Sequence, residues 1–410
     1  MRISTSWMYQ QSVSQMQAEQ SAVNAARNSV STGKAVSVAS DNPVAATQIV
    51  SISHLMASQD NYVSGINSAT TSLSLEQSTL SSVSNLLNQA NSIAIQSGNG
   101  ALSSSDRSAM ATQLSQVLTQ LQQSANTTDT AGNYLFAGTA SGQPFVANND
   151  GSISYQGTDA TQMAAVGSGL QVATGDAGSK VFMNIPAGNG SFVASSDAAN
   201  TGTLVVGSTS VTDTSAYNTA VSSDGGNYKI SFDGKGTWTA TASSGSNAGK
   251  TVATGSYTPG DTSGNESISF DGMQIGITGT PTAGDSVEVT SGAKQDVFTT
   301  LQNMVTALND SSLSSTQLTN TMNRQLESLQ QATSQVTTTE TSVGSRLSML
   351  QTQSSNYSDL SVTYKTALSG FQDADMYQAL SSLSLHTTAL QASEQAFAKV
   401  SQLSLFDYIK

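Results

Sequence analysis

Cysteine, histidine and charged residues are scarce in this 410-residue chain. The absence of cysteine excludes disulfides, thiolate nucleophiles and cysteine-ligated zinc. Two histidines, His54 and His386, cannot make a three-histidine metal site, and neither has a histidine or carboxylate three or four residues further on. Charged residues form only 10% of the chain, the net charge is −13, and the 14 basic residues are scattered. The sequence therefore offers few groups for catalysis and argues against a nucleic-acid partner.

Long apolar runs are missing as well. The first residues, Met1 to Trp7, lead into Gln- and Ser-rich sequence without the apolar stretch of a secretory signal. No segment approaches the roughly 18 consecutive apolar residues of a membrane-spanning helix. These two features alone predict a cytosolic protein without membrane insertion.

Glycine and proline divide the chain into three parts. Of the 33 glycines, 26 lie between Gly138 and Gly292, together with four of the five prolines. Flanks poor in these residues predict long helices, and the middle predicts strands and turns. The expected fold class is α+β: a long antiparallel helical bundle or coiled coil formed by both chain ends, with a central β-rich inserted domain. The expected domains are a terminal coiled coil (residues 1–40 and 372–410), a helical bundle (41–137 and 293–371) and a β-rich variable outer domain (138–292), which forms one unit or two subdomains.

Apolar residues recur every seven positions in the carboxy-terminal flank, which predicts a helix of about 50 residues. The heptad positions are Met322, Leu329, Val336, Val343, Leu350, Tyr357, Tyr364 and Phe371. The amino-terminal flank supplies a partner helix, with Asn42 as N-cap, Pro43 at the first helical position and an end at Gly98. A third helix is expected to begin at a capping box from Ser103 to Asp106. These three helices can bury one shared seam.

Two shorter amphipathic segments form the chain ends. Their heptad positions are Tyr9, Met16, Val23 and Val30 at one end and Met376, Leu383, Leu390 and Phe397 at the other. The two segments can pair as a helix hairpin within one subunit, or they can become ordered only on assembly. A monomer would leave their apolar stripe exposed, so the pattern favours assembly surfaces.

The middle of the chain alternates between apolar and polar residues, which is typical of strands. The expected strands are 228–232, 238–241, 267–270, 274–277 and 286–289. Asp233-Gly234 and Asp271-Gly272 each follow such a segment and predict hairpin turns.

No catalytic or cofactor motif emerges. Thr32-Gly33-Lys34 lacks the earlier glycine and the following hydroxyl residue of a phosphate-binding loop, so it predicts a loop between two helices. Serine and threonine make up 119 of the 410 residues, yet no Gly-x-Ser-x-Gly elbow surrounds any serine. We therefore expect no enzyme activity, no cofactor and no metal.

Several stretches resemble the flagellin-type axial proteins of the bacterial flagellum, and among them the proteins of the hook–filament junction. The stretches are Met1-Arg2-Ile3-Ser4-Thr5, Ser31-Thr32-Gly33-Lys34, Ser40-Asp41-Asn42-Pro43, Gly132-Asn133-Tyr134-Leu135-Phe136-Ala137-Gly138, Ala389-Leu390-Gln391-Ala392-Ser393 and Leu403-Ser404-Leu405-Phe406. They lie in both flanks, and the middle carries no recognisable match.

The resemblance implies a structural role at the junction that connects the hook, through hook-associated protein 1, to the flagellin filament. Such a protein forms a ring of about eleven copies, is exported by the flagellar type III apparatus with a dedicated chaperone, and resides in the extracellular flagellum without a cleaved signal peptide. This location replaces the cytosolic one. The resemblance also implies an inner tube in which the chain ends pack together, with Arg27 to Asp41 linking tube and bundle. The implied assembly residues are Ile3, Trp7, Met8, Val13, Met16 and Val23, with Leu383, Leu390, Phe397, Val400, Leu403 and Phe406.

Two other functions stay open. A flagellin filament subunit shares this architecture but polymerises without limit, and a surface fibre or adhesin would bind a glycan through its β domain. The opening residues and the ending Phe406-Asp407-Tyr408-Ile409-Lys410 favour the junction.

Overall fold

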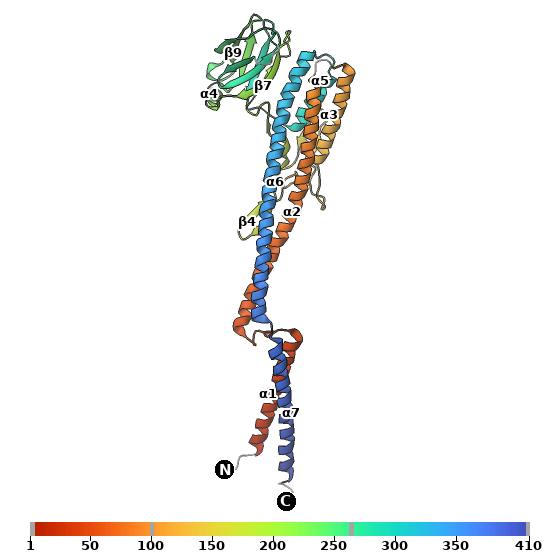
Figure 1. Cartoon of the computed structure of the whole chain (residues 1–410), viewed down its shortest axis with the longest axis vertical. Helices are drawn as coiled ribbons and strands as arrows, with labels where there is room; N and C mark the ends of the chain where they lie inside the picture. The colour runs from red at the N-terminus through yellow and green to blue at the C-terminus, as the bar shows by residue number, and fades with distance from the viewer. Residues whose placement is uncertain (1–4, 99–101, 262–265, 407–410) are drawn as a thin grey trace. The chain divides into compact units, whose positions relative to one another are not determined.

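The computed structural model describes residues 5–98, 102–261 and 266–406 (Figure 1). The chain divides into two compact units, residues 1–65 with 352–410, and residues 66–351. The helices are α1 (Thr5–Thr32), α2 (Pro43–Ser97), α3 (Ser104–Ala125), α4 (Thr214–Asp224), α5 (Val297–Asn309), α6 (Ser315–Gln372) and α7 (Met376–Phe406). Helical chain ends around a β-rich middle confirm the expected α+β class.

The predicted helix starts are confirmed by side-chain caps. At the start of α2, Asn42 Oδ1 accepts a hydrogen bond from the Ala45 backbone N–H at 3.1 Å. At the start of α3, Ser103 Oγ accepts from Asp106 N–H at 3.2 Å, and the Asp106 carboxylate accepts from Ser103 N–H at 3.3 Å. These caps satisfy donors that a helix start leaves free. Helix α1 continues to Thr32, so the linker expected to begin at Arg27 is shorter than predicted.

The heptad positions of α6 form a buried seam in the unit of residues 66–351. There Met322, Leu329, Val336, Val343 and Leu350 are at most 1% exposed, as are Leu73, Leu80 and Leu87 of α2. The bundle also contains α5, which packs on α3 and was not predicted. Helix α5 buries Phe298, Leu301 and Met304. Helix α6 spans 58 residues and begins before the first predicted heptad position.

A group of aromatic rings packs residues 136–182 against α5. The ring centroids of Phe136 and Phe182, and of Phe145 and Phe298, lie 5.2 and 5.3 Å apart. Around this group run three two-stranded sheets and one π-helical turn. They are β1 (Phe145–Ala147) with β2 (Ile153–Tyr155), β3 (Met163–Gly167) with β4 (Leu170–Ala173), β5 (Ile185–Pro186) with β14 (Lys294–Gln295), and Ser179–Met183.

Residues Phe192–Ser291, here called the outer β domain, have a separate apolar core. The five-stranded sheet has the order β10-β9-β8-β13-β6 and the three-stranded sheet has the order β11-β12-β7. Their bounds are β6 (Phe192–Ser196), β7 (Val205–Val211), β8 (Tyr228–Phe232), β9 (Thr237–Ala242), β10 (Thr251–Ser256), β11 (Ser267–Phe270), β12 (Met273–Thr278) and β13 (Ser286–Ser291). Each predicted strand lies within one of these elements.

The predicted hairpin turns are confirmed too, since β8 pairs with β9 and β11 with β12. Asp271 and Gly272 both have positive φ, 49° and 74°, as the tight turn between β11 and β12 requires. Residues 138–292 thus fall into two parts. The first packs against α5 through the aromatic group, and the second is the outer β domain. The three domain boundaries themselves stay a prediction.

Candidate assembly surface

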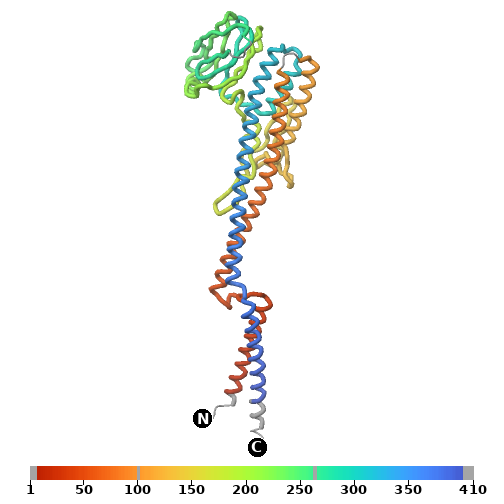
Figure 2. Tube along the Cα trace, viewed as in Figure 1, coloured from red at the N-terminus to blue at the C-terminus, as the bar shows by residue number. Residues whose placement is uncertain are grey.

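Helices α1 and α7 pack side by side within one chain (Figure 2). The rings of Tyr9 and Phe397 meet edge to face with centroids 5.0 Å apart, and Glu19 Oε2 lies 2.8 Å from His386 Nδ1. Later residues of α1 thus meet earlier residues of α7, so the helices are antiparallel. The structure contains the hairpin arrangement, and ordering on assembly stays a prediction.

The predicted assembly residues that the structure describes occupy buried, half-buried and exposed positions. Val23 is buried at 2% exposure. Half-buried positions are Val13, Met16, Leu383, Leu390 and Phe397. Trp7 and Met8 are exposed at 58% and 42%, and are thus available to a neighbour. Ile3 and the side chains of Val400, Leu403 and Phe406 lie outside the described residues. The assignment of these twelve residues to an assembly interface stays a prediction.

Sequence reasoning missed a second set of exposed apolar residues in the unit of residues 1–65 and 352–410. Twelve of the seventeen large apolar side chains that are exposed in the described part of the chain belong to this unit. Besides Trp7 and Met8 they are Val38, Val44, Val50, Leu55, Val362, Phe371, Met376, Tyr377, Leu380 and Leu385. Most lie off the heptad positions, and heptad analysis alone therefore overlooks them. This enrichment of exposed apolar residues makes the unit our candidate for a protein–protein interface.

A shallow groove of about 300 Å³ follows the α1–α7 pair. It is lined by Met8, Gln11, Ser12 and Gln15 of α1 and by Ser393, Ala396 and Phe397 of α7. Among the described residues no charged side chain lines this groove, and its walls combine apolar and amide or hydroxyl groups. Such a groove suits an apolar side chain of a neighbouring copy better than an ionic ligand.

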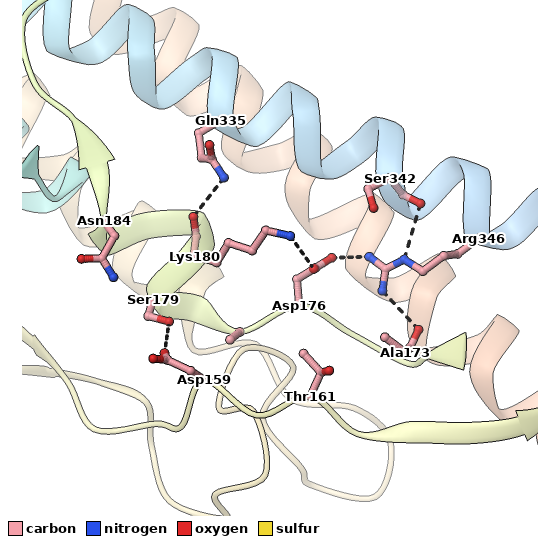
Figure 3. Close-up of a pocket in the computed structure, with 11 residues that line it drawn as sticks. Asp159, Thr161, Ala173, Asp176, Ser179, Lys180, Asn184, Gln335, Ser342 and Arg346 are labelled. Carbon is pink, nitrogen blue, oxygen red and sulfur yellow. Dashed lines mark hydrogen bonds and ion pairs between the residues drawn. The ribbon is translucent and has the colours of Figure 1, made fainter. Parts of the chain in front are cut away.

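A polar cleft of about 590 Å³ lies between α6 and the segment from β4 to β5 (Figure 3). Asp176 contacts both Arg346 of α6 and Lys180, and Asp159 accepts a hydrogen bond from the Ser179 hydroxyl. Glu76 of α2 is buried, and its Oε1 accepts a hydrogen bond from Asp176 N–H at 3.1 Å. Burial, together with the nearby Asp176 carboxylate, raises the pKa of Glu76 to about 8. These groups fasten the segment to the helices.

Neither histidine belongs to a metal site in the described residues. His54 is exposed on α2, and His386 contacts Glu19 across the helix pair. Within residues 5–98, 102–261 and 266–406, no three His, Cys, Asp or Glu side chains are placed to hold a metal ion. Over the same ranges, no helix has both the length and the apolar content to cross a membrane.

Both flanks match flagellin families in sequence. Residues 3–141 match the bacterial flagellin N-terminal helical region, and residues 326–409 match the C-terminal helical region. The middle, in which sequence reading found no resemblance, matches the D2-like domain of flagellar hook-associated protein 1 over residues 195–291.

Individual relatives and solved structures identify the family more specifically than these family models do. Flagellar hook-associated protein 3 of Salmonella typhimurium is 29% identical over 186 residues, which are 45% of this chain and 58% of that protein. The match therefore spans less than two thirds of this relative's length. The FlgL crystal structure from Xanthomonas campestris has a TM-score of 0.69 and 31% identity, covering 78% of this chain and 99% of that one. The flagellar junction protein FlgL from Legionella pneumophila has a TM-score of 0.68 and 31% identity, covering 79% and 99%. The chain belongs to the flagellar hook-associated protein 3 (FlgL) family of structural flagellar proteins.

Proposed function

We propose that this chain forms the junction that connects the hook, through hook-associated protein 1, to the flagellin filament. The likeness to FlgL over nearly the whole length of the solved chains supports this role. The proposal includes a ring of copies, a dedicated export chaperone and release through the flagellar type III apparatus to the extracellular flagellum.

The single observation that carries the mechanism is the exposed apolar surface of residues 1–65 and 352–410. Burying one large apolar side chain between neighbours contributes about 1.5–3 kcal/mol. Tyr377 is 85% exposed and Leu385 67%, so most of their contact area is available to another subunit. Because every copy carries the same surface, the gain repeats at each contact of a closed ring.

Removing the gene tests the role directly. Cells without the protein should keep their hooks, lack filaments and release flagellin into the medium, as seen by electron microscopy and immunoblotting. Labelled protein should appear at the hook end only. Label along the whole filament would instead support the flagellin alternative, and normal filaments on the deletion strain would contradict the junction role.

A matched pair of α7 variants tests the surface. Leu380→Gln removes an apolar side chain that is 52% exposed, whereas Ser384→Gln introduces the same residue at an exposed polar position one turn later. The first variant should fold and be exported but leave filaments poorly attached, and the second should support normal swimming. Equal swimming by both variants would show that this part of α7 is not an interface.

A further inference from the structure

Among the residues that the structure describes, strand β7 of the outer β domain has one edge that pairs with no other strand. In the three-stranded sheet it pairs with β12 on one side only. On its other side Asn320 of α6 binds the backbone as a strand would. Its Oδ1 accepts from Val206 N–H at 2.7 Å, and its Nδ2 donates to the Leu204 carbonyl at 2.8 Å.

The next turns of α6 extend this pairing along β7. Asn323 Nδ2 donates to the Val206 carbonyl at 3.0 Å, and Arg324 Nη2 donates to the Gly207 carbonyl at 2.7 Å. Positions 320, 323, 324 and 327 lie on one face of a helix. These side chains therefore stand in for a missing neighbouring strand.

An ion pair closes the far end of the contact. Glu327 Oε1 accepts from Thr209 N–H at 2.9 Å, and Glu327 Oε2 lies 2.6 Å from Arg324 Nη1. The two charged side chains are only 14% and 7% exposed. Each charge thus has its partner within the contact, as burial requires.

The α6 side chains of this contact are polar, and the outer β domain has an apolar core of its own. That core is formed by residues 192–289, with no α6 side chain among its described members. A cavity of about 300 Å³ lies beside the contact, lined in part by Ser195, Asp197, Gln317 and Arg324. Hydrogen bonds therefore hold the domain on the helix, while apolar burial holds the domain itself together.

We propose that Asn320, Asn323, Arg324 and Glu327 form a polar latch that holds the outer β domain on α6, and that the domain stays folded and moves when the latch opens. The chain enters and leaves the domain beside the β5–β14 pair, and the proposed motion would pivot between that pair and the domain. A junction subunit would then carry an outer domain with a held and a released position.

Amide exchange on the full chain tests the latch. The double variant Arg324→Met with Glu327→Leu removes both charges together, and Gln330→Leu at an exposed position of α6 is the control. The Thr209 and Val206 amides should exchange about tenfold faster in the double variant, while the buried Val287 amide of β13 should be unchanged. A similar rise at Val287 would overturn the proposal, because the domain would then depend on α6 for folding. No rise at Thr209 would also overturn it.

A distance measurement tests the motion. Because the chain has no cysteine, Ala248→Cys in the outer domain and Ser345→Cys on α6 place two spin labels at exposed positions of the otherwise intact protein. The distance distribution from pulsed electron spin resonance should be narrow with the native latch and broad with the double variant. Asn323→Ala, which leaves the ion pair in place, should broaden it less. Equally narrow distributions in all three proteins would contradict a released position.

Discussion

The rings of Tyr9 on α1 and Phe397 on α7 meet edge to face, with centroids 5.0 Å apart and planes inclined at 73°. Such edge-to-face pairs contribute about 0.5–1.5 kcal/mol beyond their buried area. Tyr9→Ala should therefore increase amide exchange along α1 in the isolated subunit about fivefold. Trp7→Ala, which removes an exposed ring two residues away, should leave that exchange unchanged.

Equal effects of these two variants would contradict the pairing of Tyr9 with Phe397. Exchange across α1 that is already unprotected in the native isolated subunit would instead support the expectation that the chain ends become ordered on assembly.

Glu76 should make the fold less stable at alkaline pH. Its pKa is raised from 4.5 to about 8, so between these values the unfolded chain has lost a proton that the folded chain keeps. Stability therefore falls as pH rises through this window, by on the order of a few kcal/mol. Glu76→Gln should reduce the difference between the free energies of unfolding at pH 5 and pH 9, which urea titrations measure. Glu288→Gln, on an exposed strand position, should keep the native pH dependence.

The turn between β11 and β12 should not tolerate a side chain at Gly272. Its φ is 74°, and an added Cβ would clash with the Asp213 carbonyl oxygen. Gly272→Ala should lower the free energy of unfolding of the outer β domain by about 3 kcal/mol. At Gly249, φ is 77° but nothing lies within 4 Å of the added Cβ. Gly249→Ala should therefore lower the same free energy of unfolding by only about 1–2 kcal/mol. If both variants lowered the free energy of unfolding by the same amount, the positive φ alone would explain the loss and the predicted clash at Gly272 would be wrong.

Removing the capping box of α3 should lower the free energy of unfolding by less than the Gly272 substitution does. Ser103→Ala removes the acceptor for Asp106 N–H and should destabilise the helical bundle by about 1 kcal/mol. Ser105→Ala, within the same turn but exposed and outside the box, should change the unfolding free energy by less than about 0.5 kcal/mol. Urea titrations of the two variants give the comparison, and a loss at Ser105 as large as at Ser103 would argue against the cap.

Periodicity in the sequence predicted the long helices well and the short ones poorly. The heptad repeat that includes Leu329 and Val336 identified α6, because a long seam needs many positions in register. Helix α5 has only 13 residues, although its buried Phe298, Leu301 and Met304 share one face and could have revealed it. The Ser- and Thr-rich α4 carried too few apolar positions to be found.

The polar contacts could not be predicted from spacing at all. Asn320 and Arg324 are polar residues off the apolar heptad positions of α6, where a helix is expected to face water. They are instead 6% exposed and bind β7, which lies more than 110 residues earlier in the chain. Likewise the exposed Tyr377 and Leu380 of α7 lie off the heptad register that identified the helix pair. The first set depends on a strand far away in the chain, which local sequence does not reveal, and an interface role for the second set stays a prediction.

The β5–β14 pair brings the entrance and the exit of the outer β domain to adjacent positions, since Ile185 lies opposite Gln295 and Pro186 opposite Lys294. An insertion whose two ends meet in this way can be gained, lost or exchanged between proteins without altering the register of the helices that carry it. The match of residues 195–291 to a domain of hook-associated protein 1 is consistent with such a history. Because its two ends are adjacent, insertions or deletions within the outer β domain need not shift the helices that flank it.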